Sequence, residues 1–345
     1  MPNPSVDPLA VLGRWTATDL IEVSQDLGAL DRGGRWAVTI SFEGAATLAR
    51  FRTWEQRPPR REEVGPWTGP DPHGWVSSLD EETYVDAVRA VRTHISRGEV
   101  YQANICRILR TPLDPGADIV ALHQRLVEGN PAPQSGALRL PEQGVHIASA
   151  SPELYLRRSG QRLESGPIKG TGRHPEDLLD KDRAENIMIV DLVRNDLGRV
   201  CLTGTVAVPR LLAVEAHPGL VHLVSTVVGD VRPGTTWSAI LAATFPPGSV
   251  TGAPKLAALD IIRSLEAGPR GPYCGAFGWI DADAGTAELA VGIRTFWQED
   301  AGSETKLAFG TGAGITWGSD PQAEWRETQL KAARLLHVAG EREVP

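Results

Sequence analysis

Strand-like stretches outnumber helical ones in the second half of the chain, and this imbalance constrains the fold more than any other feature. Residues 221–231 (VHLVSTVVGDV), 273–281 (YCGAFGWID), 288–296 (ELAVGIRTF) and 306–317 (KLAFGTGAGITW) all have the composition of strands. A doubly wound parallel sheet needs helices that alternate regularly with its strands, and the sequence lacks that alternation. We therefore predict a mixed α+β fold with large, mostly antiparallel sheets.

The first 79 residues are predicted to form a short β-containing segment and a linker within the same fold. Residues 35–42 (RWAVTISF) and 46–54 (ATLARFRTW) alternate as two strands of a hairpin. Residues 57–79 are rich in proline, glycine and charge, which is typical of a linker or surface loop. The main domain is then expected over residues 80–338.

Three helices are expected in that domain. Residues 80–98 have an acidic first turn, apolar residues at helical spacing and a closing glycine. Residues 182–199 and 321–340 form two further helical stretches, and residues 100–110 (VYQANICRILR) alternate as a strand between the first and second helices.

Charge and cysteine content narrow the classes of partner and compartment. The net charge of −8 argues against nucleic acid as the main partner, because phosphate binding needs a concentrated basic face. The first residues resemble no signal peptide, and no stretch approaches the length of about 20 apolar residues that spans a membrane. The three cysteines have no CxxC spacing, so we expect buried thiols in a soluble, cytoplasmic protein.

Lys169 lies in a loop-forming stretch, ESGPIKGTGR, at residues 164–173. Its glycines and proline predict a tight loop that holds one side chain toward a pocket. A solvated lysine is the commonest case. The alternatives are a lysine that binds a phosphate or carboxylate, and a lysine that acts as a nucleophile.

Two pairs of acidic residues stand near the starts of the second and third predicted helices. Asp182 and Glu185 are three residues apart, as are Glu324 and Glu327, so each pair projects from one helix face. Acidic residues there also complement the helix dipole, which contributes about 0.3–1 kcal/mol each. If the two helix starts meet, their carboxylates predict a Mg²⁺ site, because Mg²⁺ prefers oxygen ligands. The spacing leaves open which acid of each pair touches the metal.

Further residues have properties suited to an anionic ligand. GTGAGI, at residues 310–315, sits at a strand end, where glycines let backbone N–H groups approach a ligand. Arg294 is expected in the middle of a strand, where its guanidinium needs a carboxylate from the protein or from a ligand. His222 is expected to be a core histidine, and Tyr273 needs a hydrogen-bond partner if it is buried.

Several long motifs, in order, resemble those of the chorismate-utilising enzymes, which include anthranilate synthase large subunits, aminodeoxychorismate synthase and isochorismate synthase. The matching runs cover roughly residues 80–338 and are GEVYQANICR, SASPELYL, PIKGT, KDRAENIMIVDLVRNDLGR, FPPGSVTGAPK, RGPYCGAFGWI, VGIRTF and GTGAGITWGSDPQAEWRET. The resemblance implies an α+β fold of two packed, mostly antiparallel sheets flanked by helices.

The resemblance also implies a role for each candidate site residue. A Mg²⁺ ion would hold the ring carboxylate of chorismate, with Glu185 and Glu327 as direct ligands. Asp182 and Glu324 would act through a bound water or by contacting the direct ligands. The remaining substrate-binding residues would contact the second carboxylate or complete the pocket wall, and they are Tyr273, Arg294, Gly312, Ala313, Gly314, Thr171, His222 and Lys331.

Two positions indicate which family member the chain is most similar to. Isochorismate-forming relatives carry a water-activating lysine where this chain has Gln102, and an amide has no useful basicity near neutral pH. Anthranilate synthases read PIAGT where this chain reads PIKGT, which is typical of aminodeoxychorismate synthase component I. There the lysine, here Lys169, is a covalent nucleophile, and the acid matching Glu153 protonates the leaving hydroxyl group.

The same resemblance implies a glutamine amidotransferase subunit that supplies ammonia, since none of the cysteines lies in a glutaminase motif. The product would be 4-amino-4-deoxychorismate, which a separate lyase converts to 4-aminobenzoate. Anthranilate synthase is the nearest alternative, because Gln102 fits it equally well. A non-catalytic paralogue is a second alternative, which the presence of Glu153, Lys169 and the four acids argues against. The segment that lines a tryptophan pocket in longer relatives is not recognisable.

Overall fold

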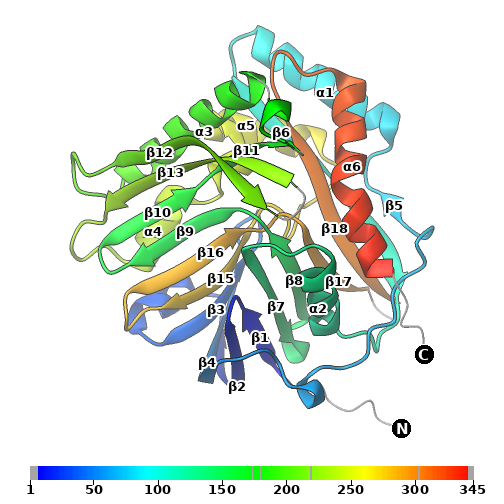
Figure 1. Cartoon of the computed structure of the whole chain (residues 1–345), viewed down its shortest axis with the longest axis vertical. Coiled ribbons are helices and arrows are strands. Elements are labelled where there is room, and N and C mark those ends of the chain that lie inside the picture. The colour runs from blue at the N-terminus through cyan, green and yellow to red at the C-terminus, as the bar shows by residue number, and fades with distance from the viewer. Residues whose placement is uncertain (1–6, 173, 179, 218–219, 302–303, 341–345) are drawn as a thin grey trace.

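A computed structural model of the chain describes residues 7–172, 174–178, 180–217, 220–301 and 304–340. Figure 1 shows a strongly curved arrangement of strands with helices packed on its outer side. Among the described residues, no helix is both long enough and apolar enough to cross a membrane.

The strands run through most of the described chain. In order they are β1 (Leu9–Leu12), β2 (Trp15–Ser24), β3 (Arg35–Ile40), β4 (Ala46–Gln56), β5 (Val76–Ser77), β6 (Gln102–Leu113), β7 (Gln134–Leu140), β8 (Val145–Ser151), β9 (Leu154–Ser159), β10 (Arg162–Gly166), β11 (Ile168–Gly172), β12 (Ala207–His217), β13 (Leu220–Asp230), β14 (Gly252–Ala253), β15 (Ala276–Asp281), β16 (Thr286–Val291), β17 (Thr295–Ala301) and β18 (Glu304–Ile315).

The helices are fewer, as the sequence predicts. The α-helices are α1 (Glu81–Ser96), α2 (Ile119–Gly129), α3 (Asp180–Gly198), α4 (Trp237–Thr244), α5 (Lys255–Leu265) and α6 (Pro321–Gly340). Short 3₁₀ turns are η1 (Leu27–Arg32), η2 (Arg61–Glu63), η3 (Pro141–Gln143), η4 (Pro175–Asp177) and η5 (Gly248–Val250). Helix α1 begins after Asp80, whose carboxylate accepts a hydrogen bond from the Thr83 N–H at 2.9 Å.

All described strand pairings are antiparallel, and they form one continuous path. From one end the order is β12, β13, β10 with β11, β9, β16, β15, β3, β4, β2, β1, β7, β8, β17, β18 and β6. The expected α+β class is therefore confirmed, and its sheets are joined through shared strands. The strands before residue 57 lie inside this path, because β3 pairs with β15 and β1 pairs with β7.

Helices pack on both ends of this path, and α2 packs on β7 and β8 within it. Helix α3 packs on β12 and β13 at one end, whereas α5 and α6 pack on β6 and β18 at the other (Figure 1). The largest apolar core lies among the middle strands, around Trp36, Leu48 and Phe277. A second core fills the space between the β6–β18 pair and helices α2 and α6. Residues of β11 and of β6 both contact the segment that contains η5, because Lys169 and Asn104 each donate a hydrogen bond to the Ser249 carbonyl oxygen.

Arg294 is an exception to the expected pattern. It does not lie within a strand, because β16 ends at Val291 and β17 begins at Thr295. Its φ of 51° is in the left-handed region, which a side chain with a Cβ rarely adopts. The run ELAVGIRTF is therefore two strands with a sharp break, and the prediction of one strand was wrong. The break turns Arg294 out of the sheet pattern, and Cys274 beside Tyr273 has a similar φ of 64°.

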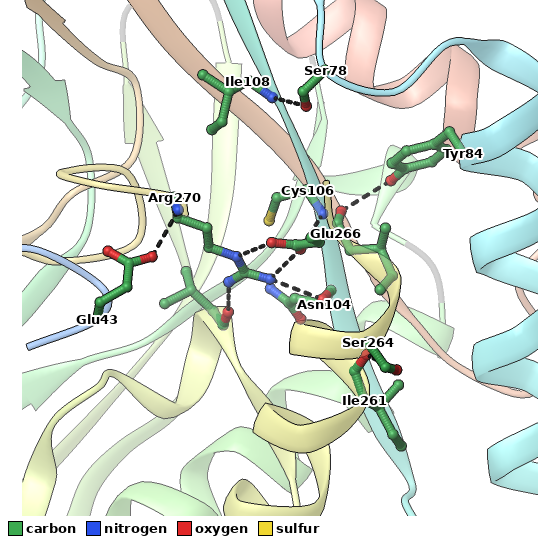
Figure 2. Close-up of polar contacts among 12 residues, drawn as sticks. Glu43, Ser78, Tyr84, Asn104, Cys106, Ile108, Ile261, Ser264, Glu266 and Arg270 are labelled. Atoms are coloured by element: carbon green, nitrogen blue, oxygen red, sulfur yellow. Dashed lines mark hydrogen bonds and ion pairs between the residues drawn. The ribbon is translucent and has the colours of Figure 1, made fainter. Parts of the chain in front are cut away.

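A buried ion pair forms hydrogen bonds that connect β6 to neighbouring segments (Figure 2). Arg270 and Glu266 are joined by hydrogen bonds of 2.7 and 2.9 Å, and the Arg270 side chain is 1% exposed. Arg270 also donates to the carbonyl oxygens of Val250 and Asn104, while Glu266 accepts the Cys106 N–H at 2.8 Å. Every polar group of the pair therefore has a partner, which is the condition under which a buried ion pair is tolerated.

Breaking this pair is expected to be costly. The Arg270→Ala change leaves the Glu266 carboxylate buried without its partner, so the free energy of unfolding should fall by about 3–5 kcal/mol. Arg263→Ala is the matched control, because Arg263 pairs with Asp260 on the same segment but both side chains are exposed. That control should cost less than about 1 kcal/mol. Equal losses in denaturant titrations of the two variants would contradict the assignment.

Candidate active site

Lys169 and Glu153 both lie beside one residue, Ser249, in the segment that contains η5. Lys169 is on β11, and its Nζ donates to the Ser249 carbonyl oxygen at 3.1 Å. Glu153 follows β8 and is 4% exposed, and the Ser249 hydroxyl and the Ile168 N–H lie beside its carboxyl group and lower its pKa. The residues predicted as nucleophile and acid therefore lie close to each other, the acid buried and the lysine half-buried.

Burial shifts the two groups in opposite directions. Burial raises the pKa of Glu153 to about 7, although the Ser249 hydrogen bond and the charge of Lys169 oppose the change. Burial lowers the pKa of the Lys169 amine, against the nearby charges of Glu185 and Glu153. Lys331 also lowers it. Both shifts favour the neutral forms, a protonated acid and an unprotonated amine, which acid catalysis and nucleophilic attack require.

The four predicted acids come together at the starts of α3 and α6. Burial raises the pKa of Glu185 and of Glu324, and the charge of Glu327 raises both further, while Asp182 also raises that of Glu185. Burial would raise the pKa of Glu327 too. The ion pair with Lys331 at 2.7 Å, together with Lys181 and Lys169, outweighs burial and lowers that pKa.

These acids fit a magnesium site that is completed by other ligands. Within the described residues, no group of three or more His, Cys, Asp or Glu side chains forms a ready-made metal cage. Mg²⁺ commonly binds through one or two carboxylates and keeps several waters or substrate oxygens. The charge of Glu327 on α6 raises the pKa of Glu185 on α3, and carboxylates that repel each other in this way are donors that such an ion suits.

Arg294 and Tyr273 present polar groups that the described protein leaves available. In the part of the chain that the structure describes, neither the Arg294 guanidinium nor the Tyr273 hydroxyl makes a hydrogen bond or ion pair. Burial lowers the pKa of Arg294, and burial raises the pKa of Tyr273 well above its ordinary value. The alternative of a protein carboxylate for Arg294 is therefore not met among these residues, and its guanidinium is available to a ligand carboxylate.

The glycines of β18 present backbone groups at an open edge. Gly312 and Gly314 lie opposite Cys106 and Asn104 of β6, whose own N–H groups donate elsewhere. Such pairs are not hydrogen-bonded, so Gly312 and Gly314 direct their N–H and C=O groups to the opposite edge. Strand β17 pairs with β18 only as far as Phe309, and the Gly312 carbonyl accepts a hydrogen bond from Lys331 at 3.1 Å.

The glycines also satisfy a packing requirement. A Cβ at Gly310 would lie 2.0 Å from the Tyr273 ring, and one at Gly314 would lie 2.4 Å from Gln102 Nε2. Ala313 between them is buried against α1 and α5. The motif therefore serves two purposes: it leaves backbone groups accessible and it makes room for two side chains of the candidate site.

The remaining predicted residues are Gln102, Thr171 and His222. Gln102 is fully buried at the start of β6, where its Nε2 donates to Asn104 Oδ1 at 3.0 Å and its Oε1 has no partner among the described residues. Thr171 on β11 pairs across the sheet with His222 on β13, which is 2% exposed and has an interaction partner.

Ser249 and Asn104 are site residues that the sequence reasoning did not single out. Ser249 lies in the run FPPGSVTGAPK, and Asn104 lies in GEVYQANICR. Asn104 Nδ2 donates to the Ser249 carbonyl at 3.2 Å, so two donors converge on that oxygen. A backbone carbonyl leaves no signal in sequence, and only the density of proline and glycine in FPPGSVTGAPK marks the segment as a shaped loop.

Comparison with known proteins identifies the family. The chorismate binding enzyme family matches residues 24–337 of this chain. The chain therefore belongs to that family, as the motif resemblance indicated.

Curated relatives carry two different names. Anthranilate synthase component 1 1 of Haloarcula marismortui is 40% identical over 277 residues, which covers 77% of this chain and 55% of that protein. Aminodeoxychorismate synthase component 1 of Escherichia coli is 37% identical over 274 residues, which covers 76% of this chain and 58% of that protein. The matched parts thus make up little more than half of these relatives.

Solved structures share the fold. The crystal structure of anthranilate synthase component I from Streptococcus pneumoniae superposes with a TM-score of 0.75 and 23% identity, covering 88% of this chain and 80% of that one. The menaquinone-specific isochorismate synthase from Escherichia coli gives a TM-score of 0.80 and 17% identity, covering 98% and 90%.

The raised pKa of Glu153 predicts a pH-dependent stability. Between about pH 4.3, the ordinary pKa of glutamate, and about pH 7, the folded chain keeps a proton that the unfolded chain releases. The stabilisation from Glu153 is thus present at low pH and is lost as pH rises, by up to about 4 kcal/mol. Denaturant titrations of the wild type and of Glu153→Gln should diverge across this window. Parallel curves would contradict the shift.

The Gly310→Ala change is expected to displace Tyr273, because the added methyl group would overlap its ring. We expect a loss of stability of about 1–3 kcal/mol and a higher KM for the substrate. Gly198→Ala is the control, since that glycine ends α3 and has no atom near its missing side chain. The control should be neutral or slightly more stable. Unchanged KM in Gly310→Ala would contradict the placement of Tyr273 in the site.

Proposed function

We propose that the chain is an aminodeoxychorismate synthase component I, which converts chorismate and ammonia to 4-amino-4-deoxychorismate on the way to 4-aminobenzoate. The observation that carries the proposal is the contact of Lys169 with the residue that also contacts Glu153. A half-buried amine and a buried acid, each shifted toward its neutral form, are the two groups that a double displacement needs.

The proposed reaction has two displacement steps. The Lys169 amine forms a bond to C2 of the chorismate ring while the ring double bond shifts and the C4–O bond breaks. Glu153 gives its proton to the departing oxygen, which leaves as water. Ammonia then forms a bond to C4, the double bond shifts back, and the C2–N bond breaks with its electron pair returning to Lys169. The new C4 ammonium group returns one proton to the Glu153 carboxylate.

The two carboxylates of chorismate have separate candidate partners. Arg294, Tyr273 and the open N–H groups of Gly312 and Gly314 suit the enolpyruvyl carboxylate. The four acids would hold Mg²⁺, with Glu185 and Glu327 as direct ligands, and the ion would neutralise the ring carboxylate. Lys331 now pairs with Glu327, and it would compensate part of the negative charge there.

Gln102 and Lys169 separate this proposal from the other reactions of the family. Gln102 is buried with its amide held by Asn104, and it offers no base for the addition of water to the ring. Anthranilate synthase remains the alternative, since several curated relatives carry that name. The position of the Lys169 amine beside Glu153 favours the amine-transfer reaction.

Ammonia has to come from another protein in this proposal. The cysteines Cys106, Cys201 and Cys274 are buried thiols, and burial raises the pKa of Cys106 and of Cys201, which opposes a nucleophilic role. We therefore propose a separate glutamine amidotransferase subunit as the partner that generates ammonia, with a soluble cytoplasmic setting for the pair.

Product analysis tests the proposed function. The protein, chorismate, Mg²⁺ and an ammonium salt should yield aminodeoxychorismate, and Lys169→Ala should lower the rate by at least about 10³-fold, because the covalent route is lost. Liquid chromatography with mass spectrometry identifies the product. Lys181→Ala is a control, since Lys181 is an exposed lysine at the start of α3.

Anthranilate with pyruvate as the wild-type product would overturn the assignment. An active Lys169→Ala variant that still forms aminodeoxychorismate would overturn the covalent route. If ammonium salts support no turnover, the same assay is run with glutamine and a glutaminase subunit before the two outcomes are compared.

A further inference from the structure

Ser249 contacts the proposed acid and the proposed nucleophile through different atoms. Its hydroxyl lies beside the Glu153 carboxyl group, with which it lines one cavity, and its carbonyl oxygen accepts a hydrogen bond from Lys169 Nζ at 3.1 Å. Ser249 itself is 5% exposed.

The position of Ser249 is itself fixed from two sides. Asn104 Nδ2 donates to the Ser249 carbonyl at 3.2 Å, and Asn104 N–H donates to Thr251 O at 2.8 Å. The next residue, Val250, accepts a hydrogen bond from the buried Arg270 guanidinium at 2.9 Å. Figure 2 shows this guanidinium between Asn104 and Glu266. The backbone around Ser249 is therefore held by hydrogen bonds from Asn104 and Arg270.

We propose that Ser249 is a positioning residue that holds Glu153 and Lys169 in register with each other, the hydroxyl orienting the acid and the carbonyl orienting the amine. The proposal rests on the proposed roles of Glu153 and Lys169. It adds to them a residue that acts on both groups through hydrogen bonds and is not itself consumed in the reaction.

The carbonyl contact orients the amine without blocking it. A neutral amine has two N–H groups and one lone pair, and a carbonyl oxygen accepts an N–H but cannot bind the lone pair. When Lys169 Nζ donates to Ser249 O, the lone pair is left to point elsewhere, toward a ring carbon. The contact therefore removes rotational freedom from the nucleophile while its reactive electrons stay accessible.

The hydroxyl contact acts on the ionised form of the acid. A hydroxyl that donates to a carboxylate stabilises that carboxylate, so it opposes the effect of burial on Glu153. The other groups that face Glu153 are the Lys169 amine and the Ile168 N–H. Asp196, paired with Lys255 at 2.6 Å, lines the same cavity of ≈ 20 Å³ as Glu153 and Ser249. Of these neighbours, the hydroxyl is removed most simply by substitution.

The test compares pH–rate profiles of Ser249→Ala and Ser249→Thr with the wild type, using chorismate consumption with product identification. Glu153 has to be protonated to act as the acid, so the rate falls as pH rises through its ionisation. Loss of the hydroxyl in Ser249→Ala should shift this fall in rate, the alkaline limb of the profile, to higher pH by about one unit. KM should change by less than about twofold. Ser249→Thr keeps a hydroxyl and should retain the wild-type limb.

Two further variants keep the test decisive. Ser264→Ala removes a hydroxyl that bonds only to the Ile261 carbonyl of α5, and its profile should match the wild type. Ser249→Cys replaces the hydroxyl by a thiol, which is a weaker hydrogen-bond donor. If Ser249→Ala does not fold, Ser249→Cys should show an intermediate shift of the alkaline limb. Coincident alkaline limbs in the wild type and in the variants that lack the hydroxyl would overturn the inference. A different product would overturn the proposed function instead, and the limb comparison would still apply.

Discussion

The ion pair between Glu266 and Arg270 holds together the segments on which the candidate site is built. Its groups bond to the backbone of β6 at Asn104 and Cys106 and to Val250 beside Ser249. Because these hydrogen bonds use all of the partners that a buried guanidinium and carboxylate require, the pair is rigid as well as tolerated. Tyr273 comes three residues after Arg270, so the same ion pair also fixes the start of the loop that carries Tyr273.

The candidate site balances burial against charge. Burial favours the neutral forms of Glu153 and Lys169, whereas their mutual attraction and the acids at the helix starts favour the charged forms. Burial has the larger effect on both groups. In the proposed function, this balance suits an acid that donates a proton and an amine that attacks, while the acids at the helix starts supply negative charge for a divalent cation.

Sequence reasoning succeeded where the signal was local and failed where it depended on tertiary packing. The helix after Asp80 followed from its cap and apolar spacing, whereas the roles of Lys169 and Glu153, which come from motifs, stay predictions. Arg294 was wrongly placed in a strand, because apolar neighbours do not reveal a break at a left-handed φ. Ser249 was missed because half of its proposed contribution comes from a carbonyl oxygen that every residue has. The convergence of Lys169 on β11 and Asn104 on β6 at Ser249 is a tertiary contact without a local signal.

The most direct test of the account is whether Lys169 becomes covalently attached to the substrate. The protein would be mixed with chorismate and Mg²⁺ without ammonia, quenched and digested, and the peptide that contains residue 169 would be examined by mass spectrometry beside that of Lys169→Arg. The account predicts a mass increase of chorismate less one water on the wild-type peptide, and none on the variant. An unmodified Lys169 peptide, from protein that forms aminodeoxychorismate once ammonia is added, would contradict it.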